Sequence, residues 1–340
     1  MRKTKYIRDL TVGDTLTDEP FAVKSVVNKV ASNGKGFRDI VLSDKTGEIL
    51  GKVWADSLIA CDLANIDDVV LVDAEVGEFR EARQLNVKKI TNNKALEFQP
   101  EDFIRSSQKD LAEMLHTIEK NIKKVKDKNL KALLNKFFDD PEFNQRFTLH
   151  PAAKMIHHAY LNGLIEHLSE MLNLAEVIAK DFPKLNHDLL IVGILLHDIG
   201  KLDELSYNRV IDISTKGRLL GHVSMSAFMV RDAIHGIKKF PEELEWQVLH
   251  LILSHHGDLA LGSPVVPMTT EALALTQLDQ LSSRVNIAYL KTEELVANAN
   301  TFSEGIFGLN NNRIYNPNNI EDSSADSGTQ ETTGQAPTLF

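Results

Sequence analysis

Residues 195–205 read LLHDIGKLDEL, and the apolar run NHDLLIVGILL before this point ends on a His-Asp pair. The run is apolar on nearly every face of a helix, so we expect a central, buried helix here. A histidine and a carboxylate are costly to bury unless they are paired, hydrogen-bonded or bound to a metal. The stretch therefore predicts a helical domain with His197 and Asp198 at a polar centre inside it.

Residues 20–92 have a different pattern, with apolar and polar residues alternating as they do in strands. Five strands are expected, with the sequences FAVKSVVNKVAS, GFRDIVLSD, ILGKVWA, VVLVDAEVGEF and QLNVKKI, and a short helix is expected at SLIACDLAN after the third. This order predicts a small barrel of the oligonucleotide/oligosaccharide-binding (OB) type, and another small β-domain is the alternative. The fold class is thus a multidomain chain, an OB-type β-barrel followed by an all-α domain.

Three residues of the barrel are candidates for contact with a nucleic acid, because bases stack on aromatic rings and phosphates pair with cations. They are Trp54 on the third expected strand and Phe37 and Arg38 on the second. The alternative is that Trp54 is a core residue and that the cations form a solvated face. DDPEFNQRF at residues 139–147 is interpreted as a turn. The domain limits that we expect are 1–98 for the barrel, 99–150 for a helical connector, 151–312 for the all-α domain and 313–340 for a disordered tail.

Composition limits the class of protein. Hydrophobic residues make up 43% and charged residues 25%, which is ordinary for a globular protein. Cys61 is the single cysteine, so neither a disulfide framework nor a thiolate zinc cluster is expected. The start, MRKTKYIRDL, has no apolar core of a signal peptide, and the apolar run near residue 195 is too short to span a bilayer. We expect a cytoplasmic protein without a membrane partner.

Histidines are concentrated in the acidic part of the chain. Of 12 histidines, 11 lie between residues 150 and 256, and residues 151–340 carry 13 Lys/Arg against 23 Asp/Glu. Each histidine alone is most simply a hydrogen-bonded core residue, and an aspartate in an apolar helix is most simply an ion-pair partner. Five histidines and two aspartates together are more than the three or four ligands that one metal needs. Seven ligands suffice for two metals that share a carboxylate. The series is His167, His197, Asp198, His222, His255, His256 and Asp279.

This order of residues resembles the HD-domain superfamily of metal-dependent phosphohydrolases in its two-metal form. The motifs HHAYLNGLIEHL, LLHDIGKLDEL, KGRLLGHV, LSHHGD, GSPVVP and LDQL, after a barrel, resemble those of the YhaM-type 3′-5′ exoribonucleases over residues 1–312. The chain departs from that family at Leu168, where threonine is common. The resemblance implies that the first metal is held by His167, His197, Asp198 and Asp279. It implies that the second is held by Asp198, His222, His255 and His256, with Asp198 bridging.

Imidazole and carboxylate ligands without thiolate predict two divalent metal ions. Manganese is our first expectation, and cobalt, iron, nickel, zinc or magnesium would also suit these ligands. Two such ions about 3.5–4 Å apart clamp a phosphate and lower the pKa of water, so a nucleophile exists at neutral pH. We expect hydrolysis of a terminal phosphodiester with release of a nucleoside 5′-monophosphate.

Lys201 is the second residue, with Asp198, to which we assign a catalytic role. It follows Asp198 by three positions, so on a helix both can face the same side and the lysine can bind a phosphate oxygen or the leaving group. The alternative is a lysine that faces water. Arg218, four residues before His222, is a second candidate for phosphate.

Tyr160 and Gly163 precede His167 by seven and four residues, so a continuous helix would place both on its face. Tyr160 is then a candidate to stack on substrate or to hydrogen-bond to it, and Gly163 leaves room for substrate. His157 and His158 are out of phase with that face and are expected to be structural. The same expectation holds for the histidines without motif context, which are His150, His187, His235 and His250.

The function expected from all these features is 3′-5′ exoribonuclease activity on single-stranded RNA, with single-stranded DNA as an open alternative substrate. One rival is an HD phosphodiesterase that cleaves a cyclic dinucleotide or a nucleotide. The other is a non-catalytic nucleic-acid-binding protein with a degenerate metal site, although all seven ligand positions are filled. Assembly into a homo-oligomer is left open.

Overall fold

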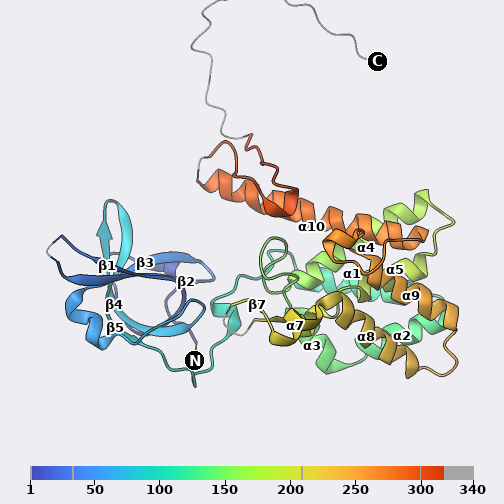
Figure 1. Ribbon diagram of the computed structural model, residues 1–340, viewed down its shortest axis with the longest axis horizontal. Helices are drawn as coiled ribbons and strands as arrows, with labels where there is room; N and C mark the ends of the chain where they lie inside the picture. Colours follow the sequence, from blue (N-terminus) through green and yellow to red (C-terminus); the bar gives the residue numbers. More distant parts are fainter. Residues whose placement is uncertain (1, 33, 208–209, 299, 318–340) are drawn as a thin grey trace, which may run out of the picture. The chain divides into compact units, whose positions relative to one another are not determined.

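The computed structural model describes residues 2–32, 34–207, 210–298 and 300–317. Its N-terminal strands form a closed barrel in the order β1-β2-β3-β5-β4, which Figure 1 shows in blue and cyan. β3 and β5 are parallel and the other neighbours are antiparallel. The predicted five-stranded barrel is confirmed. The strands are β1 (Thr15–Val30), β2 (Gly36–Asp44), β3 (Gly47–Val53), β4 (Val69–Phe79) and β5 (Ala82–Thr91).

The first strand closes the barrel because it is long and bent. β1 pairs with β4 through its first half and with β2 through its second, and its register shifts at Leu16/Glu19 and at Val23/Ser25. Such irregularities bend a strand and increase its twist, which lets one strand serve two neighbours. Alternate residues fill the interior, among them Phe21, Ile40, Val72 and Leu85.

The predicted helix over residues 57–65 is wrong in type and extent. A 3₁₀ helix, η2, covers Ala55–Ala60, and Cys61 then forms a parallel bridge with Ile90 of β5. The backbone is extended at Cys61, and its side chain is buried beside the barrel core. Two further 3₁₀ helices flank the barrel, η1 (Ile7–Asp9) and η3 (Pro100–Asp102).

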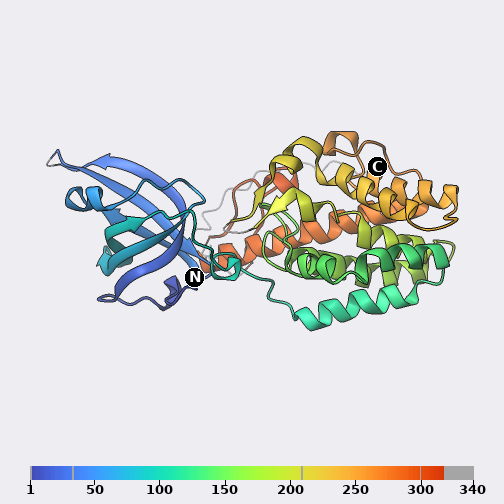
Figure 2. The same cartoon turned by 90° about the horizontal axis from the view of Figure 1, so that it is seen from below.

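Ten helices are described in the remaining chain (Figures 1 and 2). All of them except α7 contribute residues to one hydrophobic cluster, α10 through its first part. The helices of the predicted connector therefore belong to the same core, and the domain limits themselves stay predictions. The helices are α1 (Leu111–Lys124), α2 (Lys128–Phe138), α3 (Pro141–Leu149), α4 (Gly163–Asp181), α5 (His187–Leu196), α6 (Lys201–Glu204), α7 (Thr215–Leu220), α8 (His222–His235), α9 (Glu242–Ser254) and α10 (Thr270–Ala297).

The helix before the His-Asp pair is central, as its composition predicts. Every residue of α5 from Leu189 to Leu196 is buried. A Cβ on Gly193 would lie 2.9 Å from the side chain of Leu251 on α9, so this glycine allows close packing of the two helices. Each fully buried Leu or Ile stabilises the fold by about 1.5–3 kcal/mol, so α5 anchors the residues that follow it.

The predicted turn at residues 139–147 is wrong. Asp140 caps a helix here, and most of the stretch belongs to α3. The Asp140 carboxylate accepts hydrogen bonds from the backbone N–H groups of Glu142 and Phe143, and Pro141 stands at the first helical position, where its missing N–H costs nothing. Asp-Pro can therefore begin a helix as well as break one. Burial of Phe143 and Phe147 against the core decides between the two.

The chain divides into two compact units at Ser283/Arg284, and α10 runs from the first into the second. In the second unit, residues 300–317 fold back on themselves, with Ser303 N–H donating to Ile314 O and Asn316 N–H to Thr301 O. Residues 313–317 of the predicted tail are thus hydrogen-bonded, and residues 318–340 lie outside the described residues. Across the described part of the chain, every helix falls short of the length or apolarity that a membrane span requires.

Four small elements complete the described chain. A two-stranded hairpin pairs β6 (Leu205–Ser206) with β7 (Asp212–Ile213). The 3₁₀ helix η4 (Leu259–Leu261) lies after α9, and η5 (Phe307–Leu309) lies in the second unit.

Candidate metal centre

The seven predicted ligand residues come together in the structure. Five of them lie at helix ends and two lie within helices. Overlapping groups of three have ligand atoms that all lie within 4.8 Å of one another. Because the groups share members, all seven residues surround one centre. The groups are His167/His197/Asp279, His197/Asp198/His255 and His222/His255/His256.

The elements that carry these residues explain why they converge. His197 and Asp198 come directly after the buried helix α5, and His255 and His256 come directly after α9, whose last turn is buried on one side. His222 is the first residue of α8. The two others lie within helices, His167 on α4 and Asp279 on α10.

Asp198 lies in the middle of the centre and is 2% exposed. Its Oδ2 is 3.3 Å from Nε2 of His197, whereas its Oδ1 is 3.5 Å from Nε2 of His222 and 3.8 Å from Nε2 of His255. The two oxygens therefore face two different groups of histidines. This is the placement that a carboxylate shared by two cations requires.

All five histidines direct Nε2 to the centre and use Nδ1 outside it. Nδ1 of His222 faces the Glu204 carboxylate at 3.1 Å, and Nδ1 of His167 faces Ser282 Oγ at 2.9 Å. An Nδ1 that donates its proton leaves the Nε2 lone pair for a metal. The other three donate to backbone carbonyls, His197 to Ile194 (2.9 Å), His255 to Ile252 (2.7 Å) and His256 to Leu261 (2.9 Å).

These tautomers leave several lone pairs facing one another. Nε2 of His222 and Nε2 of His256 are 3.2 Å apart, and Nε2 of His167 is 3.3 Å from Asp279 Oδ1. Among the described residues, Nε2 of His197 and Oδ1 of Asp198 are buried without a hydrogen-bond partner. Buried acceptors are stable in such an arrangement only when cations lie among them, so the residues fit divalent metals.

The ionisation of the cluster suits metal binding. Burial by itself would raise the pKa of Asp198, but the neighbouring His197 and Lys201 charges hold this pKa well below its usual range. Burial lowers the pKa of His255 and of His256, and adjacent imidazoles lower both further. Carboxylates are therefore ionised and these imidazoles neutral near pH 7, which are the forms that bind metals.

The pKa of His197 shifts in the other direction. Burial lowers its pKa, but the Asp198 carboxylate outweighs burial and the net direction is upward. The carboxylate thus favours a positive charge near Nε2, which a metal ion at this position would supply.

Lys201 lies on the same side as Asp198, as the three-residue spacing predicts. Its Nζ is 2.7 Å from Asp198 Oδ2, and the residue is only 8% exposed. The alternative of a lysine that faces water is therefore wrong. Arg218, by contrast, pairs with Asp212 at 3.2 Å, and its side chain is 59% exposed, so the structure does not bring it into the cluster.

The prediction that Tyr160 shares a helical face with Gly163 and His167 is wrong, because α4 begins only at Gly163. Gly163 and His167, four residues apart on α4, do share a face. Residues 151–162 form no helix, and Tyr160 lies in this segment with its ring 6.0 Å from that of His158. A Cβ on Gly163 would lie 2.0 Å from the His158 carbonyl oxygen. The protein's own backbone therefore takes the space that we assigned to substrate.

For the same reason the sequence reasoning missed His157 and His158. Their rings lie 6.0 Å and 5.3 Å from the His167 ring, beside the centre. Positive φ angles at Ile156 (91°), His158 (45°) and Asn162 (64°) fold the segment back on itself, so helical phase does not apply. The sequence feature that could have indicated them is the His157-His158 pair shortly before the helix that carries His167.

In the barrel, two aromatic side chains form a platform. The rings of Phe37 and Trp54 are 5.3 Å apart and tilted by 31°, and Trp54 is 46% exposed. Lys52 Nζ lies 5.1 Å from the Phe37 ring centre. The alternative of a core tryptophan is therefore wrong. The third predicted residue, Arg38, donates from Nε to Asn28 Oδ1 at 3.2 Å.

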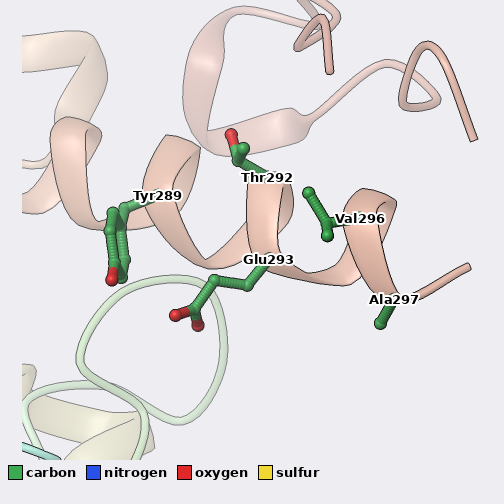
Figure 3. Close-up of a pocket in the computed structure, with 5 residues that line it drawn as sticks. All are labelled: Tyr289, Thr292, Glu293, Val296 and Ala297. Atoms are coloured by element: carbon green, nitrogen blue, oxygen red, sulfur yellow. The ribbon is translucent and has the colours of Figure 1, made fainter. Parts of the chain in front are cut away.

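Two hollows have different surroundings. The one beside the platform has a volume of about 210 Å³ and is lined by Phe37, Trp54, Lys35 and Asp56 among others. The other, about 310 Å³, lies along α10 in the second unit, and Figure 3 shows Tyr289 and Glu293 at its edge. Its lining includes none of the clustered histidines, so it is not the site of the chemistry.

A barrel followed by a helical domain with this His-Asp centre defines an HD-domain protein with a second, OB-like domain. The family model described as "HD domain" matches residues 164–284. The chain is 34% identical over 326 residues to "3'-5' exoribonuclease YhaM" of Listeria monocytogenes serotype 4b, covering 92% of this chain and 98% of the relative. It is 32% identical over 310 residues to the protein of that name from Bacillus subtilis, covering 88% and 94%. The chain belongs to the YhaM family.

One solved structure is also similar to part of the chain. The second OB-fold domain of replication protein A from Methanococcus maripaludis matches 28% of this chain at 22% identity and a TM-score of 0.21. The barrel assignment rests on the closed strand order and not on this likeness.

Proposed function

We propose that this protein is a metal-dependent 3′-5′ exoribonuclease that hydrolyses single-stranded RNA to nucleoside 5′-monophosphates. The observation that carries the proposal is the placement of Asp198, whose two oxygens face two groups of histidines. The names of the relatives over nearly the whole chain support the same reaction.

The proposed centre holds two divalent ions that share Asp198. His167, His197 and Asp279 hold one ion, and His222, His255 and His256 hold the other. When bound, the ions supply Lewis acidity and lower the pKa of water, which phosphodiester hydrolysis needs. Manganese is the first candidate, and cobalt, iron, nickel, zinc and magnesium suit the same ligands.

The chain's own cationic group at the centre is Lys201. In the proposed reaction its ammonium, held 2.7 Å from Asp198, binds a phosphate oxygen or stabilises the leaving 3′-oxygen. Bases stack on Phe37 and Trp54 of the barrel, and Arg38 pairs with a phosphate. Roles of Tyr160 and Arg218 in substrate binding stay predictions, whereas the space beside Gly163 is taken by the His158 carbonyl.

The experiment that tests the proposal offers the metal-loaded protein three kinds of substrate, of which the linear ones carry a label at the 5′ end. These are single-stranded RNA with an unmodified or a blocked 3′ end, single-stranded DNA of the same sequence, and a cyclic dinucleotide. Stepwise loss of single nucleotides from the unmodified RNA 3′ end supports the proposal, and the DNA arm decides the nucleic-acid preference. Inert RNA with a cleaved cyclic dinucleotide would establish the rival phosphodiesterase.

Metal analysis separates an enzyme from a non-catalytic binding protein. Two ions per chain after loading support the two-metal centre, whereas fewer than one would favour a degenerate site. The cytoplasmic location and the oligomeric state stay predictions for separate measurement.

A further inference from the structure

We propose that Ser282 and Glu170 form a relay that positions His167 for metal binding, so that both are positioning residues of the centre. The inference rests on the proposed metal site. It adds two residues, neither of which belongs to the predicted ligand set.

The relay follows from the direction of two hydrogen bonds. Ser282 Oγ lies 2.9 Å from His167 Nδ1 and donates to Glu170 Oε2 at 2.5 Å. A serine hydroxyl has one proton, and an ionised carboxylate can only accept, so this proton goes to Glu170. The serine oxygen must therefore accept the proton of His167 Nδ1, and the lone pair of Nε2 is left for the metal.

His167 needs a partner from another element because of its position. His197 and His255 follow the last residues of their helices and donate to the carbonyl three residues earlier, where helix ends leave carbonyls unpaired. His167 is the fifth residue of α4, where the backbone carbonyls already accept helical hydrogen bonds. The acceptor for its Nδ1 is therefore supplied by α10, 115 positions away in sequence.

Helical spacing on α10 places a partner at each nitrogen of the His167 ring. Asp279 and Ser282 are three residues apart on α10, so both face α4. Asp279 Oδ1 is 3.3 Å from Nε2 of His167 and Ser282 Oγ is 2.9 Å from its Nδ1. On α4, His167 and Glu170 are likewise three residues apart. Residues of α10 thus contact both nitrogens of the imidazole ring, and Glu170 of α4 accepts from the serine that contacts Nδ1.

Lys109 and His158 lie beside Glu170 and favour its ionised form. Lys109 Nζ is 2.5 Å from Glu170 Oε1 and His158 Nε2 is 3.3 Å from Oε2. Burial opposes ionisation, but these partners and Ser282 lower the pKa of Glu170 to about 2. The carboxylate is therefore an acceptor throughout the neutral range, as the relay requires.

The same carboxylate belongs to a group that has metal-ligand spacing of its own. His158, Glu166 and Glu170 have ligand atoms within 4.8 Å of one another. Lys109 Nζ already lies 3.3 Å from Glu166 Oε1 and 2.5 Å from Glu170 Oε1, so an ammonium supplies the positive charge there. The group serves as the anchor of the relay and not as a further metal site.

The test compares Ser282→Ala with Ser283→Ala. Ser283 is the neighbouring serine of α10, and its hydroxyl donates only to backbone carbonyls of its own helix, so its loss leaves the His167 contact intact. Titration calorimetry with Mn²⁺ measures both binding steps in each protein. We expect Ser282→Ala to weaken one of the two steps about 10- to 100-fold, the usual effect of removing such a partner, and to leave the other step unchanged.

A spectroscopic signal and a second pair of variants complete the test. The visible absorption of bound Co²⁺ should change in Ser282→Ala and not in Ser283→Ala. Glu170→Gln should weaken the same step by a smaller factor, because an amide oxygen still accepts from Ser282. Its control is Glu176→Gln, another carboxylate of α4, which pairs with Lys124.

Equal Mn²⁺ affinities and Co²⁺ spectra in Ser282→Ala and Ser283→Ala would overturn the relay. Should Ser282→Ala fail to fold, unchanged binding in Glu170→Gln would overturn it in the same way. Because the readout is metal affinity, a wild-type protein that leaves RNA intact would refute the proposed function without refuting the relay.

Discussion

Replacing Asp198 by asparagine tests the centre most directly. The carboxylate lies 2.7 Å from Lys201 Nζ and 3.3 Å and 3.5 Å from Nε2 of His197 and His222. Asparagine removes one negative charge at the point shared by both proposed ions and places an N–H₂ group near imidazole lone pairs. We expect both binding sites to be lost.

The magnitude follows from the coupling of binding to folding. An ion present at about 100 times its dissociation constant stabilises the folded state by about 2.7 kcal/mol. For a helical domain of this size each kcal/mol raises Tm by about 2–4 °C, so each ion should raise Tm of the wild-type protein by about 5–11 °C. The Asp198→Asn variant should show a shift near zero.

Thermal unfolding with Mn²⁺ and after EDTA treatment measures this shift. Asp232→Asn is the matched control, because Asp232 is an exposed carboxylate of α8 that pairs with the adjacent Arg231. The control should keep the full metal-induced shift. An Asp198→Asn protein with the same shift as the control, and with metal-dependent cleavage of RNA, would refute the bridging role of Asp198.

Three further predictions concern the lysine at the centre, the aromatic platform and a buried histidine. Lys201→Met should reduce kcat about 10²- to 10³-fold, as expected for loss of one group that stabilises developing charge. Mn²⁺ calorimetry should still find two ions in this variant. An unchanged kcat would contradict the catalytic role of Lys201. Trp54→Ala should weaken RNA binding, measured by fluorescence anisotropy, by about 1–3 kcal/mol for one stacked base. Trp246→Ala, the other tryptophan and also exposed, should bind RNA like the wild type, and equal losses in both variants would exclude a platform. Burial lowers the pKa of His150 to about 4, so its stabilising contribution is complete above the ordinary pKa of about 6.5 and is lost as pH falls toward 4. Urea unfolding should show that wild type loses about 3 kcal/mol more than His150→Asn between these pH values, and parallel losses would argue against a neutral buried imidazole.

The alternation in residues 20–92 was enough to predict the barrel, because a strand buries every second side chain and this period is visible locally. Its boundaries were less predictable. The short helix expected at 57–65 is a 3₁₀ helix that ends at Ala60, and Cys61 after it pairs with Ile90. That pairing depends on a strand 29 positions further along the chain, which local pattern does not contain.

Near the centre, sequence spacing succeeded for one contact and failed for another. Asp198 lies in the turn between α5 and α6, where the N–H of Lys201, the first residue of α6, donates to Asp198 O, and their ion pair is present. Residues 151–162 instead form a loop, with close packing of Gly163 against the His158 carbonyl and three positive φ angles. His157 and His158 therefore lie beside the centre although no periodicity indicates it.

By itself, the sequence determined the types of ligand, because a buried histidine or aspartate after an apolar helix requires a polar or metal partner wherever it lies. The order of these residues also sufficed for the family resemblance. Only the tertiary structure decided which atoms face the centre, since the Nδ1 partners of the histidines come from carbonyls, from Glu204 and from Ser282 on another helix. Contacts between residues more than a hundred positions apart depend on how helices pack, and packing is a property of the whole core.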